Sequence, residues 1–270
     1  MSTMTLTPVT RPAGGGVTAL GRHSLALAQR SLIKTTRTPE ALIDVTIQPV
    51  IFLLLFTYLF GGAIADGNRH AYLQFLLPGM LAQSVAMGGM ALGQNLNADI
   101  EKGVFDRFRS LPISRAAPLV GAVLADVVRY LTVCVVMLGF GTIVMGFRVE
   151  TGVVPTLAAV ALSIAFGLCF CWISVWVGML ARSSGAVQGI MFLLVLPLSF
   201  GSDVYVRTDT LPEVVQSFVA VNPITPLVAT IRGLLTGGPV AGPLTTTLIW
   251  MAGLLAVFVP LALRAYARRA

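Results

Sequence analysis

The residues best suited to recognition lie together in one charged segment, residues 99–115, which reads DIEKGVFDRFRSLPISR. Seven of its seventeen residues are charged, three acidic and four basic, although the segment lies between long apolar runs. Taken as a helix over 99–111, it carries one apolar stripe at spacings of four, four and three, and Pro112 ends it. The stripe consists of Ile100, Val104, Phe108 and Leu111.

This pattern is typical of a surface that docks another protein. Charges of both signs around an apolar anchor, such as Phe105 or Phe108, set the register of a protein contact. A helix that lies on lipid headgroups would be mainly cationic. The sequence therefore predicts a docking helix here, and the alternative is a solvated loop without a partner.

No other group of residues forms a catalytic or metal-binding pattern. Cys134, Cys169 and Cys171 lie in apolar runs, where a thiol behaves as a small hydrophobe, and His23 and His70 are distant from them in sequence. The sequence has no G-x-x-x-x-G-K-[ST] phosphate loop, and no acidic residue lies near the middle of a predicted span. We therefore expect no catalytic residue, metal or cofactor on this chain, and no proton or sodium pathway.

The composition places the chain in a membrane. Of its 270 residues, 56% are hydrophobic and 11% are charged, and the mean hydropathy is +0.87. Soluble domains carry roughly 25% charged residues. The net charge of +7 fits the Lys and Arg enrichment of cytoplasmic flanks, and no basic helix is long enough for a nucleic-acid groove. We expect contact with lipid and none with nucleic acid.

Six segments are candidates for crossing the bilayer, which takes about 20 mainly apolar residues. They are 42–65, 72–94, 118–146, 153–180, 185–203 and 243–263. With both termini inside, the inner segments hold 14 Lys and Arg and the outer segments hold 4. The positive-inside rule then predicts cytoplasmic termini. The expected fold class is an all-α polytopic membrane protein with no cleavable signal peptide, whose transmembrane domain covers 41–270.

The chain before the first span divides into two parts. Residues 1–17, rich in Thr, Pro and Gly, are predicted to be a disordered leader. Residues 18–40 alternate leucines with cations and are predicted to form an amphipathic helix on the inner leaflet. The cations are Arg22, Arg30, Lys34 and Arg37. The alternative is a solvated basic leader.

The segment 202–235 is too apolar for an ordinary outer loop and too polar to cross. Within it, LPEVVQSFVAV and PLVATIRGLL each read as a short helix with one apolar face. Backbone that breaks at membrane depth must be buried in protein or line a cavity. The sequence predicts two half-helices that dip into the outer leaflet, and the alternative is a surface loop.

Over about residues 20–268 the chain resembles the membrane subunit of type-2 ABC exporters, specifically the daunorubicin-resistance-like permeases of actinobacteria. Three stretches carry the resemblance. They are SLIKTTRTPEALIDVTIQPVIFLLLFTYLFGGAI, DIEKGVFDRFRSLPISRAAPLVGAVLADVVR and PLSFGSDVYVRTDTLPEVVQSFVAVNPITPLVATIRGLL.

The resemblance implies where a separate cytoplasmic ATPase would dock. That subunit would hold ATP and Mg, and this chain would hold no cofactor. A groove of the ATPase would receive the coupling helix of the first cytoplasmic loop, Asp99 to Pro112. The amphipathic N-terminal helix would form a second contact with the ATPase. The implied coupling residues are Ile100, Glu101, Lys102, Gly103, Phe105, Asp106, Arg107, Phe108 and Arg109.

The resemblance also implies an assembly and a re-entrant segment. Two permeases, here expected to be identical copies, and two ATPases would form one transporter in the bacterial plasma membrane. The family's re-entrant helices map onto 204–235, which includes Pro212, Asn222, Pro223 and Arg232.

The predicted function is the permease subunit of a drug-efflux exporter that confers antibiotic resistance by moving a hydrophobic or amphipathic compound outward. Candidate path residues, which could equally face lipid or pack in the core, are Phe52, Phe56, Tyr58, Met87, Met90 and Phe192. The alternatives are an exporter of polysaccharide, glycolipid or lipid from the same superfamily, and a proton-coupled carrier that works alone.

Overall fold

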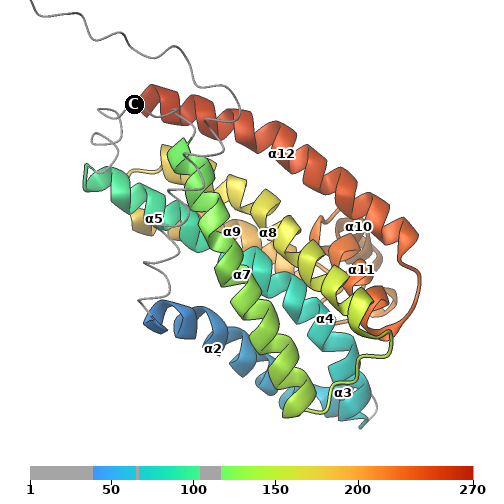
Figure 1. Ribbon diagram of the computed structural model, residues 1–270. Coiled ribbons are helices and arrows are strands. Elements are labelled where there is room, and N and C mark those ends of the chain that lie inside the picture. Colours follow the sequence, from blue (N-terminus) through green and yellow to red (C-terminus); the bar gives the residue numbers. More distant parts are fainter. Residues whose placement is uncertain (1–38, 65–66, 104–116, 270) are drawn as a thin grey trace, which may run out of the picture.

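The described part of the chain is helical throughout. The computed structural model describes residues 39–64, 67–103 and 117–269, and no strand occurs among them (Figure 1). The helices are α2 (Pro39–Leu55), the π-helix η1 (Phe56–Phe60), α3 (Gly61–Ile64), α4 (Arg69–Gly88), α5 (Met90–Glu101), α7 (Ala117–Ile143), α8 (Val153–Leu180), α9 (Ser184–Phe200), the 3₁₀ turn η2 (Thr208–Thr210), α10 (Glu213–Ala220), α11 (Ile224–Thr236) and α12 (Ala241–Arg269).

The helices match a polytopic membrane protein. Five helical stretches are long and apolar enough to cross a bilayer, namely 46–63, 69–101, 119–143, 153–180 and 241–268. The fifth predicted span, 185–203, corresponds to α9, which has only 17 residues. The prediction of an all-α polytopic membrane protein is confirmed.

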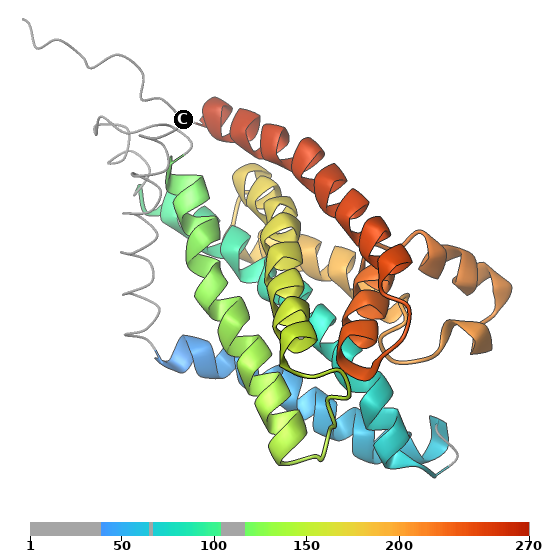
Figure 2. The same ribbon diagram turned by 45° about the vertical axis from the view of Figure 1, so that its right-hand side comes forward.

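Side-chain and backbone contacts show that successive passes alternate in direction. Leu77, early in α4, packs against Gly141, late in α7, so these two helices are antiparallel. Gly93 of α5 touches Ser174, late in α8, so α4–α5 and α8 run the same way. Figures 1 and 2 show α12 along one edge of this bundle and α2 along the opposite edge.

The two ends of the bundle are named here by residues that lie at them. The Lys102 end holds the end of α5, the turn between α8 and α9, and the C-terminal half of α12. The Gly237 end holds the start of α4, the α7–α8 connection, and the start of α12. Arg182 and Arg264 share the Lys102 end, which the positive-inside rule predicts to be cytoplasmic.

The α10–α11 hairpin leaves the bundle and returns to it at the same end. The segment between α9 and α10, which leads into the hairpin, contacts the first half of α4, where the Tyr72 hydroxyl donates to the Tyr205 carbonyl. The end of α11 lies beside the start of α8, because the Glu150 amide donates to the Leu235 carbonyl. The two helices are bent by 79°. The two predicted short helices are confirmed, and their depth in the bilayer stays a prediction.

The predicted helix over 99–111 is wrong in its first part. Helix α5 continues the second span through Ile100 to Glu101, and Lys102 caps it. Gly103 then adopts a φ of 67°, the left-handed conformation that commonly ends a helix. The span runs beyond its predicted end at 94 because Leu92, Leu96 and Asn97 are buried.

Several predicted residues lie outside the described part of the chain. They are Phe105, Asp106, Arg107, Phe108 and Arg109 in the charged segment, and Arg22, Arg30, Lys34 and Arg37 in the N-terminal segment. The leader predicted over 1–17 also lies outside it.

Candidate functional site

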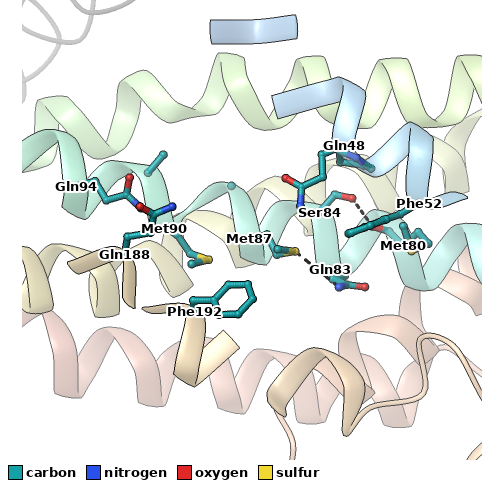
Figure 3. Close-up of a pocket in the computed structure, with 13 residues that line it drawn as sticks. Gln48, Phe52, Met80, Gln83, Ser84, Met87, Met90, Gln94, Gln188 and Phe192 are labelled. Carbon is teal, nitrogen blue, oxygen red and sulfur yellow. Dashed lines mark hydrogen bonds between the residues drawn. The ribbon is translucent and has the colours of Figure 1, made fainter. Parts of the chain in front are cut away.

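A two-lobed cavity lies between α2, the junction of α4 and α5, and α9. One lobe has a volume of about 300 Å³ and the other about 320 Å³. Each volume falls in the range of small-molecule sites. Six residues border both lobes: Gln48, Phe52, Gln83, Met87, Met90 and Phe192. Figure 3 shows these side chains around the opening.

The two lobes differ in chemistry. The lobe nearer α5, called the amide lobe, adds Ser84, Gln94 and Gln188 to the shared residues. The other, called the aromatic lobe, adds Phe56, Phe200 and Tyr205. Among the residues that the structure describes, no Asp, Glu, Lys, Arg or His lines either lobe. The described lining therefore suits the uncharged, amphipathic part of a guest, since an unpaired charge is costly to bury.

Helix irregularities lie beside the cavity. Gly89, the one residue between α4 and α5, keeps helical backbone angles, and an added Cβ there would lie 3.2 Å from the Tyr130 hydroxyl and from the Cys171 side chain. On the facing side, α2 contains Pro49 and passes into the π-helix η1. Turns of π-helix are frequent at functional positions.

The aromatic lobe is edged by rings in mutual contact. The ring centroids of Phe56 and Tyr205 lie 4.4 Å apart, and those of Phe200 and Tyr205 lie 4.9 Å apart. Phe52 meets Phe56 edge to face at 6.3 Å. Opposite them, Met87 and Met90 supply flexible thioethers that adapt to differently shaped guests.

Five of the six predicted path residues line the cavity. Phe52, Met87, Met90 and Phe192 border both lobes, and Phe56 borders the aromatic lobe. The prediction for Tyr58 is not supported, because its side chain is 57% exposed and its ring lies 5.9 Å from the Arg69 guanidinium. Tyr58 follows the lining residue Phe56 by two positions in η1, and two positions correspond to about half a helical turn, so it lies on the opposite face.

Sequence reasoning missed the glutamines of the cavity. Gln48, Gln83, Gln94 and Gln188 come from four helices that are distant in sequence but meet around one space. The occurrence of glutamine within apolar spans was a signal for such a site, because an amide there must find a polar partner or line a cavity.

A polar cluster joins the hairpin to the bundle. The Arg232 Nη1 lies 2.5 Å from the Asp203 Oδ2, and its Nη2 donates to the carbonyl of Asp203 at 2.8 Å and to that of Phe75 at 3.2 Å. The guanidinium also lies 3.9 Å from the Phe75 ring centroid. Of the other predicted hairpin residues, Pro212 and Pro223 precede α10 and α11.

Asn222 holds the break between the two hairpin helices. Its amide nitrogen donates to the carbonyls of Leu198 and Gly201, each at 2.7 Å, and its oxygen accepts from the Ile224 amide at 2.9 Å. Because Asn222 satisfies backbone groups that the bend exposes, it ties the hairpin to the end of α9.

A second polar contact, here called the α5–α8 clasp, lies toward the Lys102 end. The Gly93 amide donates to Ser174 Oγ at 2.7 Å, and that hydroxyl donates to the Met90 carbonyl at 3.1 Å. The Asn97 side chain donates to the carbonyls of Gly178 and Ala181, both at 2.9 Å. The clasp fixes α5, which leads into the charged segment, to α8.

These features define a polytopic α-helical membrane protein with a cavity between its helices and no metal-binding cluster among the residues described. Sequence comparison places it more narrowly. The pattern of the family described as ABC-2 type transporter matches residues 22–236, and the chain belongs to that family. The resemblance noted from the sequence is thereby confirmed.

Its relatives include proteins named for drug resistance. The chain is 39% identical to the daunorubicin resistance ABC transporter permease protein DrrB1 of Streptomyces coeruleorubidus, over 88% of this chain and 83% of the relative. It is 27% identical to the probable doxorubicin resistance ABC transporter permease protein DrrC of Mycobacterium tuberculosis, over 89% and 87% of the two chains. It is 24% identical to the inner membrane transport permease YadH of Escherichia coli, over 82% and 83%.

The family assigns the general role of the chain. Its relatives are named as permeases of ABC transporters, so this chain is a membrane-embedded transport subunit that works with an ATPase subunit.

Proposed function

We propose that the chain is the permease subunit of an exporter that moves a hydrophobic or amphipathic drug out of the cell. The observation that carries the proposal is the uncharged, aromatic- and methionine-lined cavity between α2, α4–α5 and α9. The relatives named for daunorubicin and doxorubicin resistance support the same class of cargo. Both termini are proposed to be cytoplasmic, and a second copy of the chain is proposed to complete the translocation path.

The described helices suggest how an ATPase could act on the cavity. The partner would dock on residues 99–112, which begin in the last turn of α5, and would supply the energy of ATP hydrolysis. Because the clasp fixes α5 to α8, a push on the charged segment would move both helices together. This movement would reach the cavity, because Met90 and Ala91 of α5 line it.

The transport arm of the test uses inverted membrane vesicles that contain the permease and its ATPase. We expect daunorubicin to accumulate inside them when ATP is added, and to stay outside when the ATPase carries a substitution that blocks hydrolysis. The readout is vesicle-associated drug fluorescence after rapid filtration. ATP-independent accumulation that follows a pH gradient would instead favour a carrier that works alone.

The docking arm tests the charged segment with Phe105→Ala and Asp106→Ala combined. Removing the apolar anchor and a rim charge should abolish most retention of the ATPase by the immobilised permease, and with it the coupled ATP hydrolysis. Asp209→Ala is the matched control, because Asp209 lies in the segment that leads into the hairpin, at the Gly237 end and therefore opposite the proposed docking surface. Equal retention by all three proteins would move the docking surface elsewhere, with residues 18–37 as the next candidate.

A further inference from the structure

Two buried polar atoms border the aromatic lobe without a hydrogen-bond partner. They are the Gln83 Oε1 of α4 and the Ser199 Oγ of α9, and they belong to a set of six such atoms in the described chain. Gln83 is 4% exposed and Ser199 is 1% exposed. The Gln83 Nε2 is already occupied, because it lies 3.7 Å from the Met87 Sδ.

Unpaired buried polar atoms are unusual in folded proteins because they lose hydration without compensation. The helical hydroxyls elsewhere in this bundle avoid that loss by donating to the carbonyl four residues earlier. Ser84 does so to Met80 at 2.6 Å, and Ser163 does so to Ala159 at 2.7 Å. Ser199 makes no such bond, so its buried hydroxyl keeps an unused hydrogen-bonding capacity at the border of the cavity.

The surroundings define the chemistry of that partner. An amide oxygen accepts a hydrogen bond, and a serine hydroxyl can donate or accept one. No Asp, Glu, Lys, Arg or His lines the described cavity, so we expect the partner's hydrogen-bonding group to be uncharged. The neighbouring rings of Phe56, Phe200 and Tyr205 offer faces and edges for an aromatic group of the same molecule.

We propose that Gln83 and Ser199 select cargo that carries an uncharged hydrogen-bond donor, such as a hydroxyl, beside an aromatic ring system. Gln83 accepts from the donor, and Ser199 completes the contact from the opposite helix. This inference rests on the proposed export function and adds to it the polarity that the cargo must have.

The test measures binding of two tritiated probes, pyrenebutanol and its methyl ether, to the purified full-length chain in lipid nanodiscs. The two probes share their ring system and nearly their size, but the ether lacks the donor. Binding to empty nanodiscs is subtracted for each probe, because both partition into lipid. For the wild-type chain we expect the alcohol to bind about threefold to tenfold more tightly, the factor typical of one net hydrogen bond.

The decisive variant is Gln83→Met, which keeps the side-chain length and removes the amide. We expect the preference for the alcohol to fall below about twofold, while the affinity for the ether is unchanged. Ser199→Ala should reduce the preference in the same direction. Ser163→Ala is the matched control, since its buried hydroxyl is paired within its own helix and lines neither lobe, and it should keep the wild-type preference.

Each other outcome overturns the inference. A preference that survives in Gln83→Met would mean that a different group reads the donor, or that water satisfies the two atoms. An equal loss of affinity for both probes in that variant would mean that Gln83 only shapes the cavity. Failure of the wild-type chain to bind either probe would exclude an uncharged aromatic alcohol as the class of guest.

A separate measurement keeps this result distinct from the proposed function. The same permease preparation, combined with its ATPase, is assayed for ATP-driven accumulation of daunorubicin in vesicles. Transport without a donor preference would overturn the selection by Gln83 and Ser199 and leave the exporter standing. A donor preference without ATP-driven transport would support the binding site and would contradict the proposed export function.

Discussion

At the scale of single residues, Arg232 and Asp203 form the charged contact on which the hairpin depends. Their side chains are 19% and 18% exposed, and Arg232 also donates to the Phe75 carbonyl and lies over the Phe75 ring. Removing one partner of such a largely buried ion pair is costly, because the remaining charge keeps its desolvation penalty and loses its attraction to the partner. By contrast, Arg207 and Asp209 are 71% and 65% exposed.

This contrast predicts different effects of the two arginines. Arg232→Ala should lower the free energy of unfolding by about 3–5 kcal/mol. Arg207→Ala should lower it by less than about 1 kcal/mol, because water screens an exposed pair. Thermal unfolding of the purified protein can be followed with a thiol-reactive dye, since Cys134, Cys169 and Cys171 are buried in the fold.

A double variant isolates the buried charge as the cause. Arg232→Met combined with Asp203→Leu removes both charges, and it should recover most of the stability that Arg232→Ala loses. If the double variant were as unstable as the single one, packing around the guanidinium rather than the unpaired carboxylate would explain the loss.

At the scale of elements, the α5–α8 clasp depends on two helices that approach closely at glycines. A Cβ added at Gly93 would lie 2.1 Å from the Ser174 carbonyl oxygen, and one added at Gly178 would lie 2.5 Å from the Gly93 carbonyl oxygen. Small residues at helix contacts let backbones meet in membrane proteins, where burial of apolar side chains drives little association. The clasp therefore needs glycine at both positions.

Gly93→Ala should push α5 away from α8 and lower the free energy of unfolding by about 1–3 kcal/mol. It should also weaken coupling between ATP hydrolysis and transport, measured as drug moved per ATP. Gly139→Ala is the matched control, because nothing lies within 4 Å of a Cβ placed at that position in α7. It should be neutral or stabilise by up to about 1 kcal/mol. Normal coupling in Gly93→Ala would contradict the transmission role of the clasp.

At the scale of the whole molecule, the alternating passes and the returning hairpin place both ends of the described chain on one side. Six passes that alternate, with a hairpin that begins and finishes at the Gly237 end, bring the C-terminal half of α12 to the Lys102 end. Which side of the membrane this end faces follows only from the distribution of Lys and Arg.

Labelling of single cysteines tests that orientation. In a chain whose three native cysteines are replaced, Asp209→Cys should react with a membrane-impermeant maleimide in intact cells, because Asp209 lies in the hairpin connection and is exposed. Arg182→Cys, in the exposed turn between α8 and α9, should react only after the membrane is opened. The reverse pattern would place both termini outside and would contradict docking of a cytoplasmic ATPase at residues 99–112.

Much of the candidate site could be anticipated from the order of residues, and the rest could not. The five long spans, the shorter helix α9 and the two hairpin helices follow local rules of hydropathy, proline placement and helical spacing. The continuation of α5 through Ile100 did not follow such a rule. It depends on Asn97 and Gly93 meeting α8, about 80 residues away.

The sequence by itself determined that this chain is a multi-pass membrane protein of a recognisable transporter family, because hydropathy, charge bias and motif spacing are local properties. Only the tertiary structure decided which polar side chains face a common space. Gln83 and Ser199 border one cavity because α4 and α9, which are far apart in the sequence, lie on either side of it. Their lack of partners depends on the positions of every neighbouring helix, and no local pattern in the sequence specifies those positions.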